Sequence, residues 1–188
     1  SYDDWQDFIK VLKKDPTGRR FCNADGEVVL HIDLTPTGNW TPIEHFTGVF
    51  NGNGHTITLN CESTANKVGL FALMGGTVKN LTVENFSSDG EIATTGTIAA
   101  YAEGATFENI AITDCNPRVY NIGNGGIVGC VGWYAKEAGL KTTFKNITVD
   151  NSNKISALWG SYDVACGGIV GQYYPTSGQT SANTPKNG

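Results

Sequence analysis

The chain has 188 residues, enough for one domain with a sizeable core. Charged residues make up only 16% of it and glycines number 24, a composition that favours a turn-rich β protein over a helical one. The net charge is −5 and no Lys/Arg cluster is present, which argues against a nucleic-acid partner, and no run of about 18 apolar residues could span a membrane.

Residues 2–14 have the pattern of an amphipathic helix that ends before Pro16. Its apolar positions are Trp5, Phe8, Ile9 and Leu12. We expect residues 1–20 to form an N-terminal α-helical cap that covers the open edge of a β structure, with a partner-binding helix as the alternative. No apolar leader precedes this helix, so any export signal is expected to be missing from the sequence.

Residues 27–34, EVVLHIDL, alternate between apolar and polar side chains, which is typical of a strand. Leu30, Ile32 and Leu34 share one face of this strand. We expect that face to point into the core.

The stretch 68–83, VGLFALMGGTVKNLTV, recurs along the chain. It returns at 97–112, again with an insertion at 126–149, and begins once more at 168–173. The apolar residue that opens each copy advances in steps of 28, 29 and 42 residues, and an Asn before the second apolar triplet advances in steps of 29 and 37. Three short strands per unit indicate one coil of a solenoid, because a single unit cannot bury its own inner face and copies must stack.

The sequence therefore predicts an all-β fold, a β-solenoid of about five coils with three short strands each, over residues 21–174. The repeated asparagines are expected to form a structural ladder at one corner, amide to amide. They are Asn80, Asn109 and Asn146. The predicted core comprises Leu30, Ile32, Ile57, Leu59, Leu70, Leu81, Val83, Ile98, Ile110, Ile112, Ile127, Ile147, Val149 and Ile169. Residues 175–188 have no large apolar side chain and are expected to be a flexible tail or linker.

One segment has a more specific pattern than the repeats. Residues 40–59 read WTPIEHFTGVFNGNGHTITL, and VGLF and VKNLTV follow at 68–71 and 78–83. Over residues 27–174 the chain resembles the bacterial GLUG-motif repeat proteins. This resemblance implies a right-handed parallel β-helix, a secreted or surface-anchored bacterial protein, and an adhesin-like module of a longer chain. It implies no catalytic residues, because the family motif is structural.

The insertions in the later repeats carry four flat aromatic residues. They are Trp133, Tyr134, Trp159 and Tyr162. Insertions into a solenoid emerge on loops, where such rings can stack on sugars or anchor a protein partner, although they can also fold back over a widened coil. The sequence thus predicts a non-catalytic secreted or cell-surface module for adhesion or for glycan or protein binding.

A polysaccharide lyase or glycoside hydrolase is the alternative. Glu84 and Asp150 stand on outer positions two coils apart, roughly 9.5 Å at sheet spacing, which lies in the range of inverting hydrolases. No Arg or Lys stands in the neighbouring outer column, and the histidines have no triad or metal spacing. We therefore predict no catalytic residues, no cofactor and no metal.

The cysteines number five and include no C-x-x-C pair, which argues against a disulfide framework. We expect free thiols that pack as small apolar groups, Cys115 among them. Two of the four N-x-S/T sequons fall on the asparagine ladder, where a glycan would not fit, so glycosylation is not expected.

Overall fold

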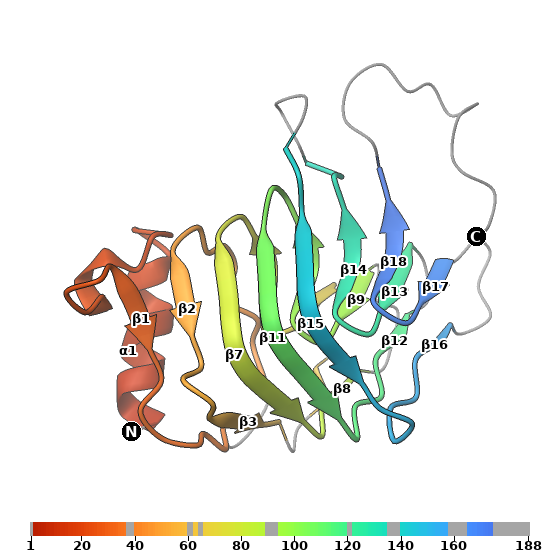
Figure 1. Cartoon of the computed structure of the whole chain (residues 1–188), viewed down its shortest axis with the longest axis horizontal. Coiled ribbons are helices and arrows are strands. Elements are labelled where there is room, and N and C mark those ends of the chain that lie inside the picture. The colour runs from red at the N-terminus through yellow and green to blue at the C-terminus, as the bar shows by residue number, and fades with distance from the viewer. Residues whose placement is uncertain are drawn as a thin grey trace.

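The structure, a computed structural model, describes residues 2–36, 40–59, 62–63, 66–88, 94–119, 122–134, 140–157 and 165–174. These residues form short strands for the most part, with one helix at the N-terminal end (Figure 1). The helices are α1 (Tyr2–Leu12) and the 3-10 turn η1 (Arg19–Phe21). The strands are β1 (Glu27–Val29), β2 (Val49–Asn51), β3 (Thr56–Thr58), β4 (Glu62–Ser63), β5 (Lys67–Val68), β6 (Phe71–Met74), β7 (Thr77–Glu84), β8 (Ser87–Ser88), β9 (Thr94–Gly96), β10 (Ala99–Ala102), β11 (Thr106–Thr113), β12 (Arg118–Val119), β13 (Gly123–Gly125), β14 (Val128–Val131), β15 (Thr143–Val149), β16 (Ser156–Ala157), β17 (Ala165–Gly167) and β18 (Val170–Tyr173).

Every ladder between these strands is parallel. The largest sheet has the order β1-β2-β7-β11-β15, with β3 also beside β7, and its members stand side by side in Figure 1. Two further sheets have the orders β6-β10-β14-β18 and β5-β9-β13-β17, and β4-β8 and β12-β16 form pairs. Strands of one repeat therefore pair with their counterparts in the next. The prediction of an all-β fold with parallel strands is confirmed.

The repeated asparagines explain how one long strand keeps three apolar side chains inside. In β7, Val78, Leu81 and Val83 are buried, yet two outward residues separate the first pair. Asn80, the second of these two, has φ = 54°, the left-handed conformation that Asn tolerates better than most residues. Asn109 in β11 and Asn146 in β15 have φ values of 54° and 53°. The left-handed φ of each Asn interrupts the regular alternation of the strand, so that the apolar residues on both sides of it face the interior.

The core follows from the register of these strands. Val78, Phe107 and Phe144 are aligned across β7, β11 and β15, and the rings of Phe107 and Phe144 stack with their centroids 5.2 Å apart. Equivalent columns continue in the neighbouring sheets, so one apolar cluster extends from α1 to β14. Similar side chains thus lie on one another from repeat to repeat.

Helix α1 lies beside β1, at the N-terminal end of the main sheet (Figure 1). Its apolar side, Trp5, Phe8 and Leu12, is buried and belongs to the core cluster. The Trp5 ring stacks on Trp40 at 5.7 Å, and the Phe8 ring lies 6.3 Å from that of Phe50. The helical spacing in the sequence therefore corresponds to a real packing face.

Two residues were wrongly predicted to lie in the core. Ile32 is 50% exposed, because the chain bends after β1 and the next inward side chain is Leu34, which bridges to Ile57. Ile169 is 39% exposed, because it lies beside β17 and β18, the last strands of their sheets. Leu30, Ile147 and Val149 are partly buried against the core, and the remaining predicted positions are buried.

The segment G-I-V-G occurs at residues 126–129 and 168–171, and its final Gly permits a close approach between two sheets. A Cβ at Gly129 in β14 would lie 2.6 Å from the carbonyl oxygen of Thr95 in β9. A Cβ at Gly171 in β18 would lie 2.5 Å from the backbone nitrogen of Asn124 in β13. Any larger residue would push the two layers apart, so the segment is a packing motif.

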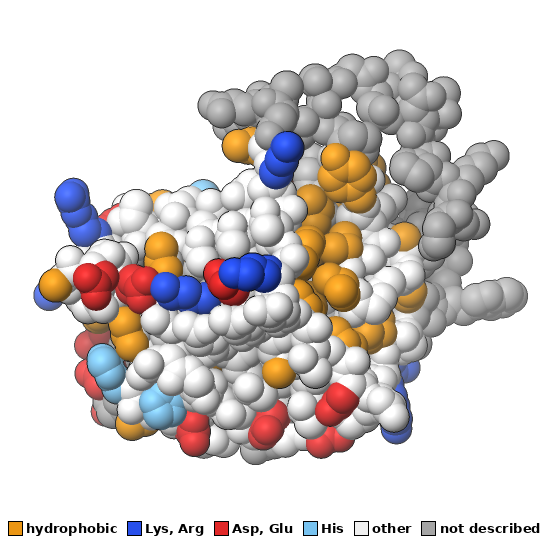
Figure 2. All heavy atoms as spheres, viewed as in Figure 1, with side chains coloured by type: hydrophobic (Ala, Val, Ile, Leu, Met, Phe, Trp, Pro, Cys, Tyr) orange, Lys and Arg blue, Asp and Glu red, His pale blue; other side chains and the backbone are white. Residues whose placement is uncertain are grey.

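The end of the molecule opposite α1 exposes apolar side chains (Figure 2). Strands β15, β16, β17 and β18 each stand last in their sheets there. Leu140 and Tyr173, 47% and 55% exposed, line a hollow of about 560 Å³ together with Phe144. Among the described residues, no helix is long and apolar enough to cross a membrane.

Candidate binding site

The candidate site lies on the face of sheet β6-β10-β14-β18 that points away from the core. Leu73, Tyr101 and Cys130 are aligned there across β6, β10 and β14. Tyr101 and Cys130 form a small apolar cluster apart from the main core, against which Leu73 and Tyr174 pack. The strands therefore present a second apolar surface on their outer side.

Two exposed aromatic residues extend this surface just after β14. Gly132 has φ = 86° and turns the chain, so that Trp133 and Tyr134 lie over the sheet. The Tyr134 ring meets Tyr101 edge to face at 5.0 Å, and the Trp133 ring meets Tyr174 in the same way at 4.7 Å. Trp133 and Tyr134 are still 41% and 40% exposed. We call Tyr101, Trp133, Tyr134 and Tyr174 the aromatic patch.

Lys67, in β5, adds a positive charge to the aromatic patch. Its ammonium lies 4.9 Å from the centroid of the Tyr134 ring and 5.6 Å from that of Tyr101. A cation over aromatic faces is attracted to them by about 0.5–1 kcal/mol at exposed sites. Lys67 therefore helps to hold the two tyrosines in place.

Glu103 fixes the backbone of the patch. Its Oε1 accepts a hydrogen bond of 2.6 Å from the backbone N–H of Tyr134. Its Oε2 is buried and has no hydrogen-bond partner among the described residues, and burial raises the pKa of this carboxyl group above its ordinary value. Burial of this carboxyl group costs free energy, and its hydrogen bond to the backbone orders the loop that bears Trp133 and Tyr134.

Tyr101 forms the floor of the patch. Its side chain is buried, and its hydroxyl oxygen accepts a hydrogen bond of 2.7 Å from the Thr94 hydroxyl. Burial raises the pKa of Tyr101 to about 12, so the phenol stays neutral and supports the rings above it without taking part in proton transfer.

Two of the four predicted site residues, Trp133 and Tyr134, lie together at the surface, and their rings also contact Tyr101. A binding role for them stays a prediction. Trp159 and Tyr162 lie outside the described residues. Sequence reasoning missed Tyr101 and Lys67. The signal for Tyr101 was an aromatic residue on the outer phase of β10, where the aligned positions of β6, β14 and β18 carry Leu73, Cys130 and Gln172.

The three predicted ladder asparagines are joined by side-chain hydrogen bonds. Asn80 donates from Nδ2 to Oδ1 of Asn51 at 3.1 Å, Asn109 donates to Asn80 at 2.8 Å, and Asn146 donates to Asn109 at 2.9 Å. Asn51, which the sequence analysis did not include, begins the row. Asn80 and Asn109 each use both the amide oxygen and the amide nitrogen for neighbouring repeats, which is a structural role.

Glu84 and Asp150, the two carboxylates considered for a hydrolase, are not part of the aromatic patch. Glu84 is aligned with Thr113 of β11, whose hydroxyl donates to Oδ2 of Asp150 at 3.5 Å. Asp150 accepts hydrogen bonds from the backbone and hydroxyl of Ser152 and from Nδ2 of Asn153. These bonds tie Asp150 into a turn after β15, so its oxygens are engaged in holding the backbone.

Among the described residues, no set of three or more His, Cys, Asp or Glu side chains comes together in a way that could hold a metal ion. The cysteines in the same part of the chain are free thiols. Cys115 and Cys130 are buried, Cys166 is exposed, and burial raises the pKa of the Cys115 thiol to about 11. Cys61 lies outside the described residues.

Comparison with known proteins gives one similarity. No protein-family model matches the chain, and no solved structure matches it significantly. Halomucin of Haloquadratum walsbyi is 35% identical over 120 residues, which cover 57% of this chain. The chain spans about 1% of the length of halomucin.

Proposed function

We propose that the chain is a non-catalytic module of a secreted or cell-surface protein and that its aromatic patch binds a glycan or a protein partner. The observation that supports this most is the pair of exposed rings, Trp133 and Tyr134, held over a rigid sheet by Tyr101, Glu103 and Lys67. Exposed aromatic side chains offer a large contact area for few frozen torsions, which suits both sugar stacking and protein contacts.

We also propose that the chain folds as a right-handed β-solenoid of GLUG-type repeats with α1 as its cap. Pairing of each strand with its counterpart one repeat away supports the coiling, and the burial of Trp5, Phe8 and Leu12 supports the cap. The likeness to halomucin, a surface protein, supports a place outside the cell. A bacterial origin stays a prediction.

A glycan array followed by calorimetric titration of the best array ligand tests the binding function. Trp133→Ala should weaken binding by more than about 1 kcal/mol, a common threshold for interface hot spots. Because Trp133 is only partly buried, its loss should lower the melting temperature by no more than about 2–4 °C, the shift expected per kcal/mol for a domain of this size.

Tyr173→Ala serves as the matched control, because this ring is 55% exposed but lines the hollow at the end of the molecule. Its affinity for the same glycan should equal that of the unmodified protein. Equal losses in both variants, or no array ligand at all, would contradict the patch as a glycan site. Release of reducing ends from polysaccharides, abolished by Asp150→Asn, would favour the hydrolase alternative instead.

A further inference from the structure

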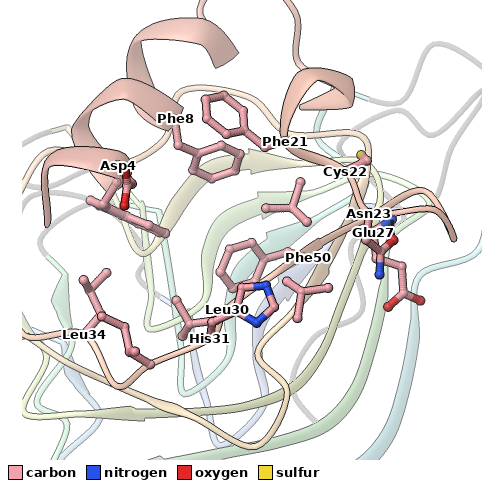
Figure 3. A pocket seen from close by; sticks show the side chains of 14 residues that line it. Asp4, Phe8, Phe21, Cys22, Asn23, Glu27, Leu30, His31, Leu34 and Phe50 are labelled. Carbon is pink, nitrogen blue, oxygen red and sulfur yellow. Dashed lines mark hydrogen bonds between the residues drawn. The ribbon is translucent and has the colours of Figure 1, made fainter. Parts of the chain in front are cut away.

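A pocket of about 430 Å³ lies between α1 and the strand β1 (Figure 3). Its volume is within the range of about 300–1,000 Å³ that is usual for small-molecule sites. Figure 3 shows Phe8 and Phe21 on the helical side facing Leu30, Leu34 and Phe50 across the space. Asp4, Glu27, Val28 and Ile32 also line the pocket.

The walls of this pocket are fixed by the core. The Phe8 ring packs edge to face on Phe21 at 5.4 Å and lies 6.3 Å from Phe50, which is itself fully buried. Val28 and Leu34 are buried at the two ends of the strand segment. A ligand would therefore meet a preformed surface, and little conformational entropy would be lost in shaping it.

Ile32 is an apolar side chain of the pocket wall that the fold leaves exposed to water. It continues the apolar phase of Leu30 and Leu34, and yet it is 50% exposed and lines the pocket. Positions where a consistent apolar pattern ends at the surface are candidates for functional sites. A ligand in the pocket would remove Ile32 and the half-buried Leu30 from water.

The charges at the pocket restrict the ligand class. Asp4 and Glu27 are among the lining residues, and no Lys or Arg lines the pocket within the described part of the chain. Glu27 is already paired with Lys79, whose ammonium lies 2.5 Å from Oε1, so that cation is not available to a ligand. Bringing an anion into an apolar site without a counter-charge is costly, so fatty acids and other anions are disfavoured.

We propose that the pocket between α1 and β1 binds a small, neutral, mainly aromatic molecule. Such a ligand would contact the accessible apolar side chains of Phe21, Leu30 and Ile32, in front of the buried rings of Phe8 and Phe50, and would avoid repulsion by the acidic side chains. The site is separate from the aromatic patch, because it lies at the β1 edge of the main sheet and shares no residue with the patch. It therefore does not depend on the function proposed above.

The test compares two fluorescent probes that share one aromatic framework. N-phenyl-1-naphthylamine is neutral, whereas 8-anilinonaphthalene-1-sulfonate adds a single sulfonate. The neutral probe should give a saturable rise in emission with the full chain, and the sulfonate should bind at least about tenfold more weakly, as one unfavourable charge of about 1.4 kcal/mol implies.

Two matched variants locate the bound probe. Ile32→Ser should weaken binding of the neutral probe at least about fivefold, in line with the loss of buried methylene contacts. Leu140→Ser is the control, because Leu140 is 47% exposed and lines the apolar hollow at the other end. Circular dichroism checks that both variants fold. A missing saturable signal, equal binding of both probes, or a larger loss in Leu140→Ser would overturn the proposal.

Discussion

Replacing Asn109 by Ala tests the role of the asparagine ladder most directly. Asn109 stands in the middle of the row, where Nδ2 donates to Asn80 at 2.8 Å and Oδ1 accepts from Asn146 at 2.9 Å. Alanine removes both bonds. The neighbouring amides are at the surface and regain water, so each bond is worth the lower part of the usual range, about 0.5–1 kcal/mol.

The backbone adds a second cost. Asn109 has φ = 54°, a conformation that alanine adopts less readily than asparagine, at a cost of about 1 kcal/mol. The free energy of unfolding should therefore fall by about 2–3 kcal/mol in Asn109→Ala. The measurement is urea unfolding followed by fluorescence of the buried Trp5 and Trp40, with the denaturant slope expected to stay unchanged.

Asn53 provides a control for the backbone term. It also has φ = 54°, and none of its side-chain atoms takes part in a hydrogen bond within the described part of the chain. Asn53→Ala should therefore lower the unfolding free energy by only about 1 kcal/mol. The difference between the two variants measures the ladder itself. Equal losses at Asn53 and Asn109 would refute the view that the side-chain row holds successive repeats together.

The all-β fold with parallel strands can be predicted from the sequence because the apolar strand pattern is repeated. The triplets that begin at Leu81, Ile110 and Ile147 recur in one phase, and parallel pairing brings them into register. The polar residue before each triplet is the same amide, and the structure gives it a left-handed φ in β7, β11 and β15. Periodicity over several copies averages out the local ambiguity that a single short strand would have.

The errors fall at the ends of the described sheets. Ile32 lies in the bend after β1, the edge strand of the main sheet, and Ile169 adjoins β17 and β18, which end their sheets. A repeat pattern records which face is apolar, but burial also requires a partner element over that face. Sequence alone does not state where the stack ends, so the outermost positions are overpredicted as core.

Only half of the aromatic patch, Trp133 and Tyr134, could be identified from the sequence. Trp133 and Tyr134 stand out because they interrupt a repeat, whereas Tyr101 sits within one and resembles a core residue. Lys67 is 34 positions from Tyr101, as the sequence numbering shows, and meets it only because β5 and β10 belong to adjacent sheets. Contacts between sheets depend on how the turns fold, which strand periodicity does not encode.

Three further measurements examine the core, the thiols and the surface charge. Phe107→Ala should cost about 3–5 kcal/mol of unfolding free energy in urea titration, because the ring is fully buried. Iodoacetamide labelling followed by peptide mass mapping should modify the exposed Cys166 in the folded protein and Cys115 only after unfolding, and early labelling of Cys115 would contradict its burial. The last concerns Glu27, whose pKa is held below its ordinary value of 4.5 chiefly by the hydrogen bond from Lys79. Because the folded pKa is the lower one, the stabilisation is complete above the ordinary value and is lost as the pH falls through the lowered pKa. Glu27→Gln should therefore be less stable than the unmodified protein at neutral pH, and the difference should shrink in acid. A difference that persists unchanged in strongly acidic buffer would show that the carboxylate charge is not what stabilises this contact.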